Sequence, residues 1–219
     1  MSRDASVVVI GGGRFGRLAV QRLGRRVAVV VEPEPAPELL SLGATVVRED
    51  GIAYLDRLLE APAAERPSWV VPMLPRHLAG EWLFRSLCRL SPHFLAPPRR
   101  CLPQVATFME GEAGQFYLSL ADFICPDDCP EPARVCTVTG KPRGEPMFSR
   151  LEGMDCPGWG VAVLRSRQLA PGVGGLRCGE LLELRQRLAA RGGRWVVATA
   201  CRCHGVAQGL VLEEARGGA

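Results

Sequence analysis

The sequence contains no long apolar run. Its longest early run, Val7–Ile10, is far shorter than the core of a signal peptide, and no later segment approaches the roughly 20 apolar residues that a membrane-spanning helix needs. The sequence therefore predicts a cytoplasmic protein without membrane insertion.

An excess of charge of one sign is also absent. The chain has 27 lysines and arginines against 23 aspartates and glutamates, and its arginines are scattered instead of being grouped among aromatic residues. Proteins that bind DNA or RNA usually gather basic side chains into a patch. We therefore expect no nucleic acid among the partners of this protein.

Cysteine does not occur before Cys88, although the whole chain has nine cysteines. An odd number cannot pair completely within one chain, and in a reducing compartment clustered cysteines indicate metal ligands or redox groups before disulfides. At 219 residues the chain is long enough for two modest domains. We expect the thiol-free first part and the thiol-rich second part to carry different chemistry.

The first part alternates short β-branched strands with amphipathic helices. A strand at 6–10, a helix at 14–25 and a strand at 27–31 make one complete βαβ unit. The pattern predicts a Rossmann-type parallel sheet within residues 1–100, and repeated prolines then place a domain boundary near residue 100. The further elements expected here are a helix at 37–42, strand 45–47, helix 52–60, strand 69–71 and helix 78–90.

The remaining residues, 101–219, predict a smaller α/β domain that carries a cysteine-rich, metal-binding insertion at 125–146. Its clearest part resembles a second βαβ crossover, and the glycine-containing segment 170–175 within it is expected to be a plain connector rather than a second anion-binding turn. The expected elements are strand 115–124, strand 160–164, helix 179–190, strand 195–199 and a short final strand at 210–212.

A glycine motif, Gly11-x-Gly13-x-x-Gly16, lies between the first strand and the first helix, the context that a dinucleotide-binding fingerprint requires. The helix would offer free N–H groups to a pyrophosphate. Glu32 ends the second strand, where an acid binds ribose hydroxyls and repels a 2′-phosphate, so NAD(H) is favoured over NADP. Arg14, beside Phe15 in the loop, is placed to touch a phosphate. The alternative is a tight turn and a solvated Glu32 with no ligand.

The segments 8–19 and 43–50, which read VVIGGGRFGRLA and GATVVRED, resemble the nucleotide-binding domain of the regulators of potassium conductance. The resemblance covers about residues 5–75. It implies a Rossmann fold, a regulatory NAD(H), ATP or AMP ligand, a link to potassium transport and a homodimer. It also implies that Gly11, Gly13 and Gly16 line the phosphates, that Glu32 binds the ribose and that Asp50 borders the adenosine pocket. A weaker likeness is to the NAD-dependent dehydrogenase of sirohaem synthesis.

His77 follows the fourth predicted strand of the first part. The carboxyl ends of parallel strands face the ligand crevice of such a sheet, so His77 is the candidate general acid or base, with Arg76 beside it. The alternatives, which we favour, are that His77 caps the following helix or lies in solvent.

Two groups of cysteines predict a shared metal site. Cys125, Cys129 and Cys136 lie within twelve residues, and Cys201 and Cys203 precede His204. Thiolate and imidazole ligands suit zinc or an iron–sulfur cluster. A redox-active thiol pair and inert cysteines remain the alternatives, and His204 is either a ligand or an ordinary polar side chain. Of the isolated cysteines, Cys88, Cys101 and Cys178 are expected to be small buried hydrophobes, whereas Cys156 is left open.

These patterns together predict a regulatory or redox-sensing protein that binds NAD(H) in its first domain and zinc or an iron–sulfur cluster through its cysteines. The alternative is an NAD-dependent oxidoreductase that passes hydride or electrons to a substrate near the domain interface, assisted by His77 or the metal. A third hypothesis makes the metal a structural staple in an assembly partner.

Overall fold

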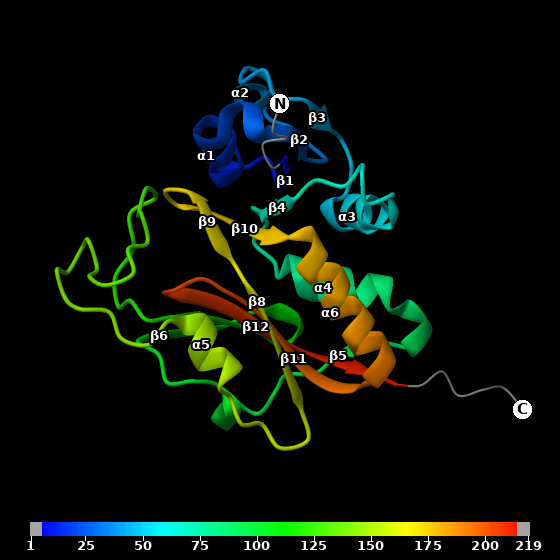
Figure 1. Cartoon of the computed structure of the whole chain (residues 1–219), viewed down its shortest axis with the longest axis vertical. Coiled ribbons are helices and arrows are strands. Elements are labelled where there is room, and N and C mark those ends of the chain that lie inside the picture. The colour runs from blue at the N-terminus through cyan, green and yellow to red at the C-terminus, as the bar shows by residue number, and fades with distance from the viewer. Residues whose placement is uncertain (1–5, 214–219) are drawn as a thin grey trace, which may run out of the picture.

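The computed structural model describes residues 6–213, and it is a mixed α/β protein with two six-stranded sheets (Figure 1). The first sheet has the strand order β3-β2-β1-β4-β10-β9. Strands β1 to β4 run parallel, as the β-branched runs predict, whereas β10 is antiparallel to β4 and to β9. The strands of this sheet are β1 (Val7–Ile10), β2 (Val27–Val31), β3 (Val46–Val47), β4 (Trp69–Pro72), β9 (Arg167–Ala170) and β10 (Val173–Arg177).

The second sheet has the order β6-β7-β12-β11-β8, with β5 paired to β12 outside this path. Within residues 6–213 its only parallel pair is β8 with β11, as the predicted crossover requires, and both the β9–β10 hairpin and a helix lie between these two strands in sequence. Strand β12 is much longer than the short final strand expected at 210–212. The strands are β5 (His93–Phe94), β6 (Thr107–Glu110), β7 (Gln115–Ser119), β8 (Gly160–Arg165), β11 (Gly193–Ala200) and β12 (His204–Leu212).

Six α-helices and four short 3₁₀-helices connect these strands within residues 6–213. The helix at 147–152 was not expected, and the helix expected at 14–25 ends at Leu23 because Gly24 takes a positive φ of 53°. The α-helices are α1 (Arg14–Leu23), α2 (Pro37–Leu40), α3 (Gly51–Glu60), α4 (Leu78–Ser86), α5 (Met147–Glu152) and α6 (Cys178–Arg191). The 3₁₀-helices are η1 (Gly24–Arg26), η2 (Cys88–Leu90), η3 (Arg99–Cys101) and η4 (Glu112–Gly114).

The segment 170–175 is not the plain connector that its glycines predict. It contains the end of β9, a two-residue turn and the start of β10, and this hairpin adds two strands to the first sheet from beyond the expected boundary near residue 100. Ser166 is the only residue between β8 and β9, so the chain passes directly from the second sheet to the first (Figure 1). The first sheet is therefore built from both sides of residue 100.

One hydrophobic core joins the two sheets. Because side chains alternate along a strand, Val8 and Ile10 of β1 face this central core, whereas Val7 and Val9 face the opposite side of the first sheet. The central core combines buried residues of α3, α4 and α6 with residues from both sheets. Helices α1 and α2 cover the outer face of the first sheet, and α5 covers the outer face of the second.

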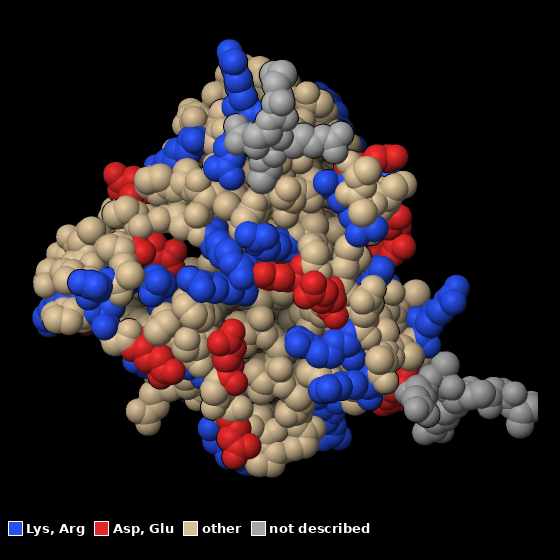
Figure 2. Space-filling model, in the orientation of Figure 1, with Lys and Arg blue, Asp and Glu red and all other residues tan. Residues whose placement is uncertain are grey.

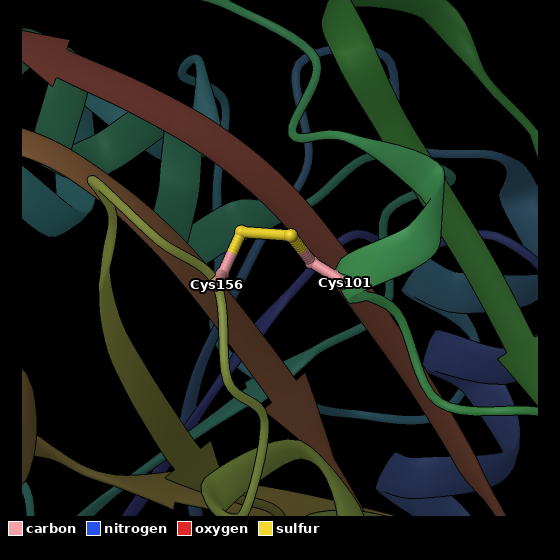
Figure 3. Close-up of a disulfide and its surroundings, with 2 residues drawn as sticks. All are labelled: Cys101 and Cys156. Carbon is pink, nitrogen blue, oxygen red and sulfur yellow. A yellow bond between two sulfur atoms is a disulfide. The ribbon is translucent and has the colours of Figure 1, made fainter.

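A disulfide joins Cys101 to Cys156 across 55 positions of the chain, with Cα atoms 5.1 Å apart (Figure 3). Both residues are buried, as expected for Cys101. The expectation that Cys101 is unpaired was wrong, because the fold brings Cys156 beside it. Cys178 is buried as expected, whereas Cys88 is exposed, contrary to the prediction, because it follows the end of α4.

On the face of the molecule in Figure 2, basic and acidic side chains are interspersed. Charges of both signs also pair across the surface, as in the Arg57–Glu49 and Arg185–Glu60 ion pairs. Among the described residues, no helix is long and apolar enough to cross a membrane.

Candidate functional site

The glycine loop, Gly11–Gly16, makes a close turn that side chains would obstruct. A Cβ atom on Gly16 would lie 2.1 Å from the carbonyl oxygen of Gly11, and one on Gly11, whose φ is 104°, would lie 2.5 Å from the carbonyl oxygen of Met73. Gly13 differs, since no atom lies within 4 Å of the place its Cβ would take. Two glycines therefore serve close packing, and Gly13 faces open space at the start of α1.

The helix that follows offers an uncapped amino terminus. Gly13 is the N-cap residue of α1, so no side chain caps the helix, and its first turn has no acid. Such an end presents unpaired N–H groups and a positive helix dipole to an anion. The geometry thus leaves space and donors at the position where the motif predicts a phosphate.

Glu32 contacts the glycine loop directly. Its Oε2 accepts a hydrogen bond of 2.6 Å from the N–H of Gly12, and its Oε1 accepts one of 3.2 Å from Glu34. The side chain is half-buried at the end of β2, so it is not the solvated strand end of the alternative interpretation. A carboxylate thus lies beside the loop, about where the motif places the ribose acid.

Asp50 and His77 have defined structural partners. Asp50 caps α3 by accepting from the N–H groups of Ile52 and Ala53 at 3.0 and 2.9 Å. His77 is 1% exposed, and its Nε2 lies 3.0 Å from Thr199 Oγ1. It is the N-cap residue of α4, as one alternative expected, although its side chain makes no capping hydrogen bond, and it is not solvated, contrary to the other alternative.

Burial lowers the pKa of His77 to about 4, against the opposing effect of the Gln208 side chain. The ring is therefore neutral near pH 7. Its Nδ1 atom has no hydrogen-bond partner among residues 6–213. Since Thr199 and Gln208 belong to β11 and β12, this buried imidazole links the carboxyl end of β4 to the second sheet, where it borders a cavity of about 310 Å³.

The fold brings the two groups of cysteines together. The segment 125–146, here called the cysteine loop, has no helix or strand apart from an isolated bridge between Val135 and Pro142. It lies against the turn between β11 and β12, where Cys125 Sγ is 3.7 Å from His204 Nε2. Burial and the neighbouring thiols of Cys129, Cys203 and Cys136 raise the pKa of Cys125.

Two of these thiols receive hydrogen bonds from the backbone that follows them. Cys201 Sγ accepts from the N–H groups of Cys203 and His204 at 3.5 and 3.4 Å. Hydrogen bonds from the backbone and side chain of Thr139 and from the backbone of Val138 lower the pKa of Cys136. Such donors favour the thiolate, which is the form that binds metals. At Cys201, however, burial and the Glu131 carboxylate outweigh them and raise the pKa to about 12.

The donor set suits a metal, although its side chains do not converge on one point. Among residues 6–213, no three His, Cys, Asp or Glu side chains are arranged to hold an ion. His204 directs Nδ1 to Cys201 at 3.8 Å and Nε2 to Cys125, so one ring nitrogen cannot serve both contacts around one ion. Thiols and an imidazole are nevertheless the kinds of ligand that zinc and iron–sulfur sites use.

The cysteine loop also contacts the glycine loop. Arg14 forms an ion pair with Asp127, and Arg22 donates to the carbonyl oxygen of Asp127 at 2.6 Å. A cavity of about 590 Å³ is lined by Phe15 together with Cys125, Cys129, Cys201, Cys203 and His204. The glycine loop therefore contributes one side chain, that of Phe15, to the cavity that holds these cysteines.

Sequence analysis missed several residues that build this site. Three of them belong to no sequence motif, and each contacts a residue more than 55 positions away. Arg143 contacts Cys203, Glu131 accepts from the N–H of Arg202, and Thr199 contacts His77. Only the fold brings these pairs together.

The comparisons with known proteins identify a family. A family model described as "Uncharacterized protein, C-terminal domain" matches residues 79–213, beginning inside α4. A protein of Archaeoglobus fulgidus described as "Uncharacterized protein" is 30% identical over 216 residues, which cover 93% of this chain and 98% of that protein. No solved structure matches. The chain therefore belongs to the family whose carboxy-terminal domain this model describes.

Proposed function

We propose that this protein binds NAD(H) on the glycine loop and zinc or an iron–sulfur cluster through its cysteines, and that it acts as a regulatory or redox sensor. The observation that carries the proposal is the cavity shared by Phe15 of the glycine loop and the thiols of the cysteine loop and the β11–β12 turn. A ligand bound at either site would alter ligand binding at the other.

A Rossmann-type unit for the first sheet is part of this proposal. The parallel order β3-β2-β1-β4 matches the first four strands of the order 3-2-1-4-5-6 of such a fold. The open space at Gly13, the uncapped start of α1 and the carboxylate of Glu32 support a dinucleotide with its pyrophosphate at the helix and its ribose near the acid. A homodimer and a link to potassium transport rest on the family resemblance alone.

The cysteine site supplies soft ligands. When bound, zinc would stabilise the fold of the loop, whereas an iron–sulfur cluster would add one-electron chemistry. The residues that would hold either group are Cys125, Cys129, Cys136, Cys201 and Cys203. Asp127, which lies between Cys125 and Cys129 in the chain and contacts Arg14 and Arg22, would transmit its presence to α1.

In the oxidoreductase alternative, either His77 or the metal assists the transfer to the substrate. That residue is buried and hydrogen-bonded to Thr199, and its low pKa makes it a weak base at neutral pH. The sensor is therefore the better-supported hypothesis.

The test uses the full chain purified under anaerobic conditions. Metal analysis and an absorption spectrum distinguish zinc, a coloured iron–sulfur cluster and no metal, and a titration with NADH followed by fluorescence measures nucleotide binding. We expect one metal site and saturable NADH binding without turnover by added electron acceptors. Absence of both ligands would overturn the proposal, and NADH oxidation that is lost in His77→Gln would favour the oxidoreductase.

A further inference from the structure

A second cavity, of about 570 Å³, adjoins the cysteine loop and is here called the basic cavity. Its wall comes from the chain before β6, the chain after β7, the second arm of the cysteine loop, α5 and the turn between β11 and β12. Four of its lining side chains are cations, and only Asp122 is an acid. The four cations are Lys141, Arg143, Arg150 and Arg202.

The fold brings these cations together from three places in the chain. Lys141 and Arg143 belong to the cysteine loop, Arg150 to α5, and Arg202 to the turn between β11 and β12. The carbonyl oxygen of Arg202 accepts from the N–H of Met147 at 2.8 Å, which fixes this turn against the start of α5. Like charges that are gathered in one hollow repel each other, so an anion placed among them would relieve the repulsion.

No carboxylate neutralises the four cations. Other arginines of this protein pair with acids, as Arg57 does with Glu49. Within residues 6–213, none of the cations of the basic cavity forms an ion pair. In Lys141 and Arg202 the hydrogen bonds of the described structure are made by the backbone. Both of these side chains are therefore available to a ligand.

The other two cations are held in place by partners that are not carboxylates. Arg150 donates to the carbonyl oxygens of Gln104 and Glu145 at 3.1 and 3.2 Å. Arg143 donates through NH1 to Cys203 Sγ, and its buried Nε has no hydrogen-bond partner among residues 6–213. Because buried N–H groups are nearly always paired, this donor marks a place where an acceptor is missing.

The rest of the wall limits the kind of anion. The side chains of Val105, Leu120 and Phe123 give the basic cavity an apolar part. Its volume lies within the range of about 300–1,000 Å³ that is usual for small-molecule sites. Guanidinium groups match the geometry of phosphate and carboxylate groups. The basic cavity thus suits a molecule that has such a group at one end and an apolar body at the other.

We infer that the basic cavity binds a small organic anion through a phosphate or carboxylate group, with Lys141, Arg143, Arg150 and Arg202 as its cationic contacts. This inference goes beyond the proposed function, since the site requires neither NAD(H) nor a metal. Cys125 and Cys203 line both this cavity and the one that Phe15 lines. The bound anion would therefore lie beside the proposed metal site.

The experiment titrates the full chain with phenyl phosphate and, separately, with phthalate, and follows binding by isothermal calorimetry at low salt. We expect at least one probe to bind at a single site, and the probe that binds more tightly identifies the acid group. Lys141→Gln and Arg202→Gln should each weaken binding about 10-fold, the usual effect of losing a hydrogen bond to a charged group. Arg194→Gln, which removes the same charge from an exposed position on β11, is the matched control and should leave binding unchanged.

A further variant separates this cavity from the start of α1, where phenyl phosphate would also find free N–H groups. Gly13→Asp puts a carboxylate at that helix end and should leave probe binding unchanged. Loss of binding in Gly13→Asp, equal affinities in Arg202→Gln and Arg194→Gln, or no binding of either probe would overturn the inference. Failure of the chain to bind NADH and metal would instead overturn the proposed function and leave this inference standing.

Discussion

At the scale of single residues, Gly13 is the position where a side chain fits the folded protein but not the proposed ligand. Its φ of −64° is available to any residue, and its missing Cβ faces open space. It is also the N-cap of α1, where an aspartate is among the best capping residues. A substitution of Gly13 by aspartate should therefore stabilise the fold and weaken nucleotide binding.

We expect Gly13→Asp to abolish NADH binding, because its carboxylate would repel the pyrophosphate, and to raise the free energy of unfolding by a few tenths to about 1 kcal/mol. Isothermal calorimetry and urea denaturation measure the two effects. Gly13→Asn, which caps without charge, is the control and should retain more affinity. Unchanged NADH affinity in Gly13→Asp would rule out a phosphate at this helix end.

His77 makes stability depend on pH. Its folded pKa of about 4 lies below the ordinary value of 6.5, because burial disfavours the charged ring. The neutral imidazole therefore stabilises the fold fully above pH 6.5, and this contribution is lost as the pH falls from 6.5 to 4.

The shift predicts a loss of about 3 kcal/mol in unfolding free energy across that range, measured by urea denaturation at several pH values. In His77→Gln this part of the slope should vanish, whereas in His93→Gln, a change at an exposed position, it should persist. The same slope in both variants would contradict a buried neutral His77.

At the scale of elements, the disulfide joins η3 to the segment between α5 and β8. It closes a loop of 55 residues that contains β6, β7 and the cysteine loop. The cysteine loop has little hydrophobic core of its own. Cross-links that close long loops limit the unfolded chain more than they change the folded one. The disulfide is therefore expected to matter for stability rather than for binding.

We expect the double variant Cys101→Ser, Cys156→Ser to lower the unfolding free energy by up to about 4 kcal/mol. Cys88→Ser, at an exposed position, should change it little. Thiol titration of the denatured, unreduced chain should find the seven free cysteines Cys88, Cys125, Cys129, Cys136, Cys178, Cys201 and Cys203. A count of nine would mean that the disulfide does not form under those conditions.

At the scale of the whole molecule, the contact between Arg14 and Asp127 links the two proposed sites. Arg14 is the first residue of α1, and Asp127 lies between two candidate metal ligands. A phosphate at the helix end would compete with Asp127 for Arg14, whereas a metal would fix Asp127 in its present place. The two ligands should therefore weaken each other's binding, by the same factor in both directions.

Because this ion pair is exposed, we expect the effect to be about two- to fivefold. The measurement is the Kd for NADH with and without bound zinc. Asp127→Asn should remove the difference, and its exposed neighbour Asp128→Asn should preserve it. Equal NADH affinities in the zinc-loaded and zinc-free forms of the unaltered chain would exclude this coupling.

The sequence by itself determined the local elements of the first part and the close turn of the glycine loop. These depend on contacts within a few residues: β-branched runs make β1 and β2, and Gly11 and Gly16 allow a turn that no Cβ would permit. The same local information predicted the parallel pair β8 and β11 around α6.

Only the tertiary structure decided which distant segments meet. The β9–β10 hairpin joins the first sheet because an edge strand of that sheet accepts antiparallel pairing, and no local pattern encodes this partner. The disulfide, the buried His77–Thr199 contact and the Arg143–Cys203 contact depend in the same way on residues 55 to 122 positions apart. Side-chain type can be read along the chain, but the pairing of charges, sulfurs and buried donors follows from how the sheets pack.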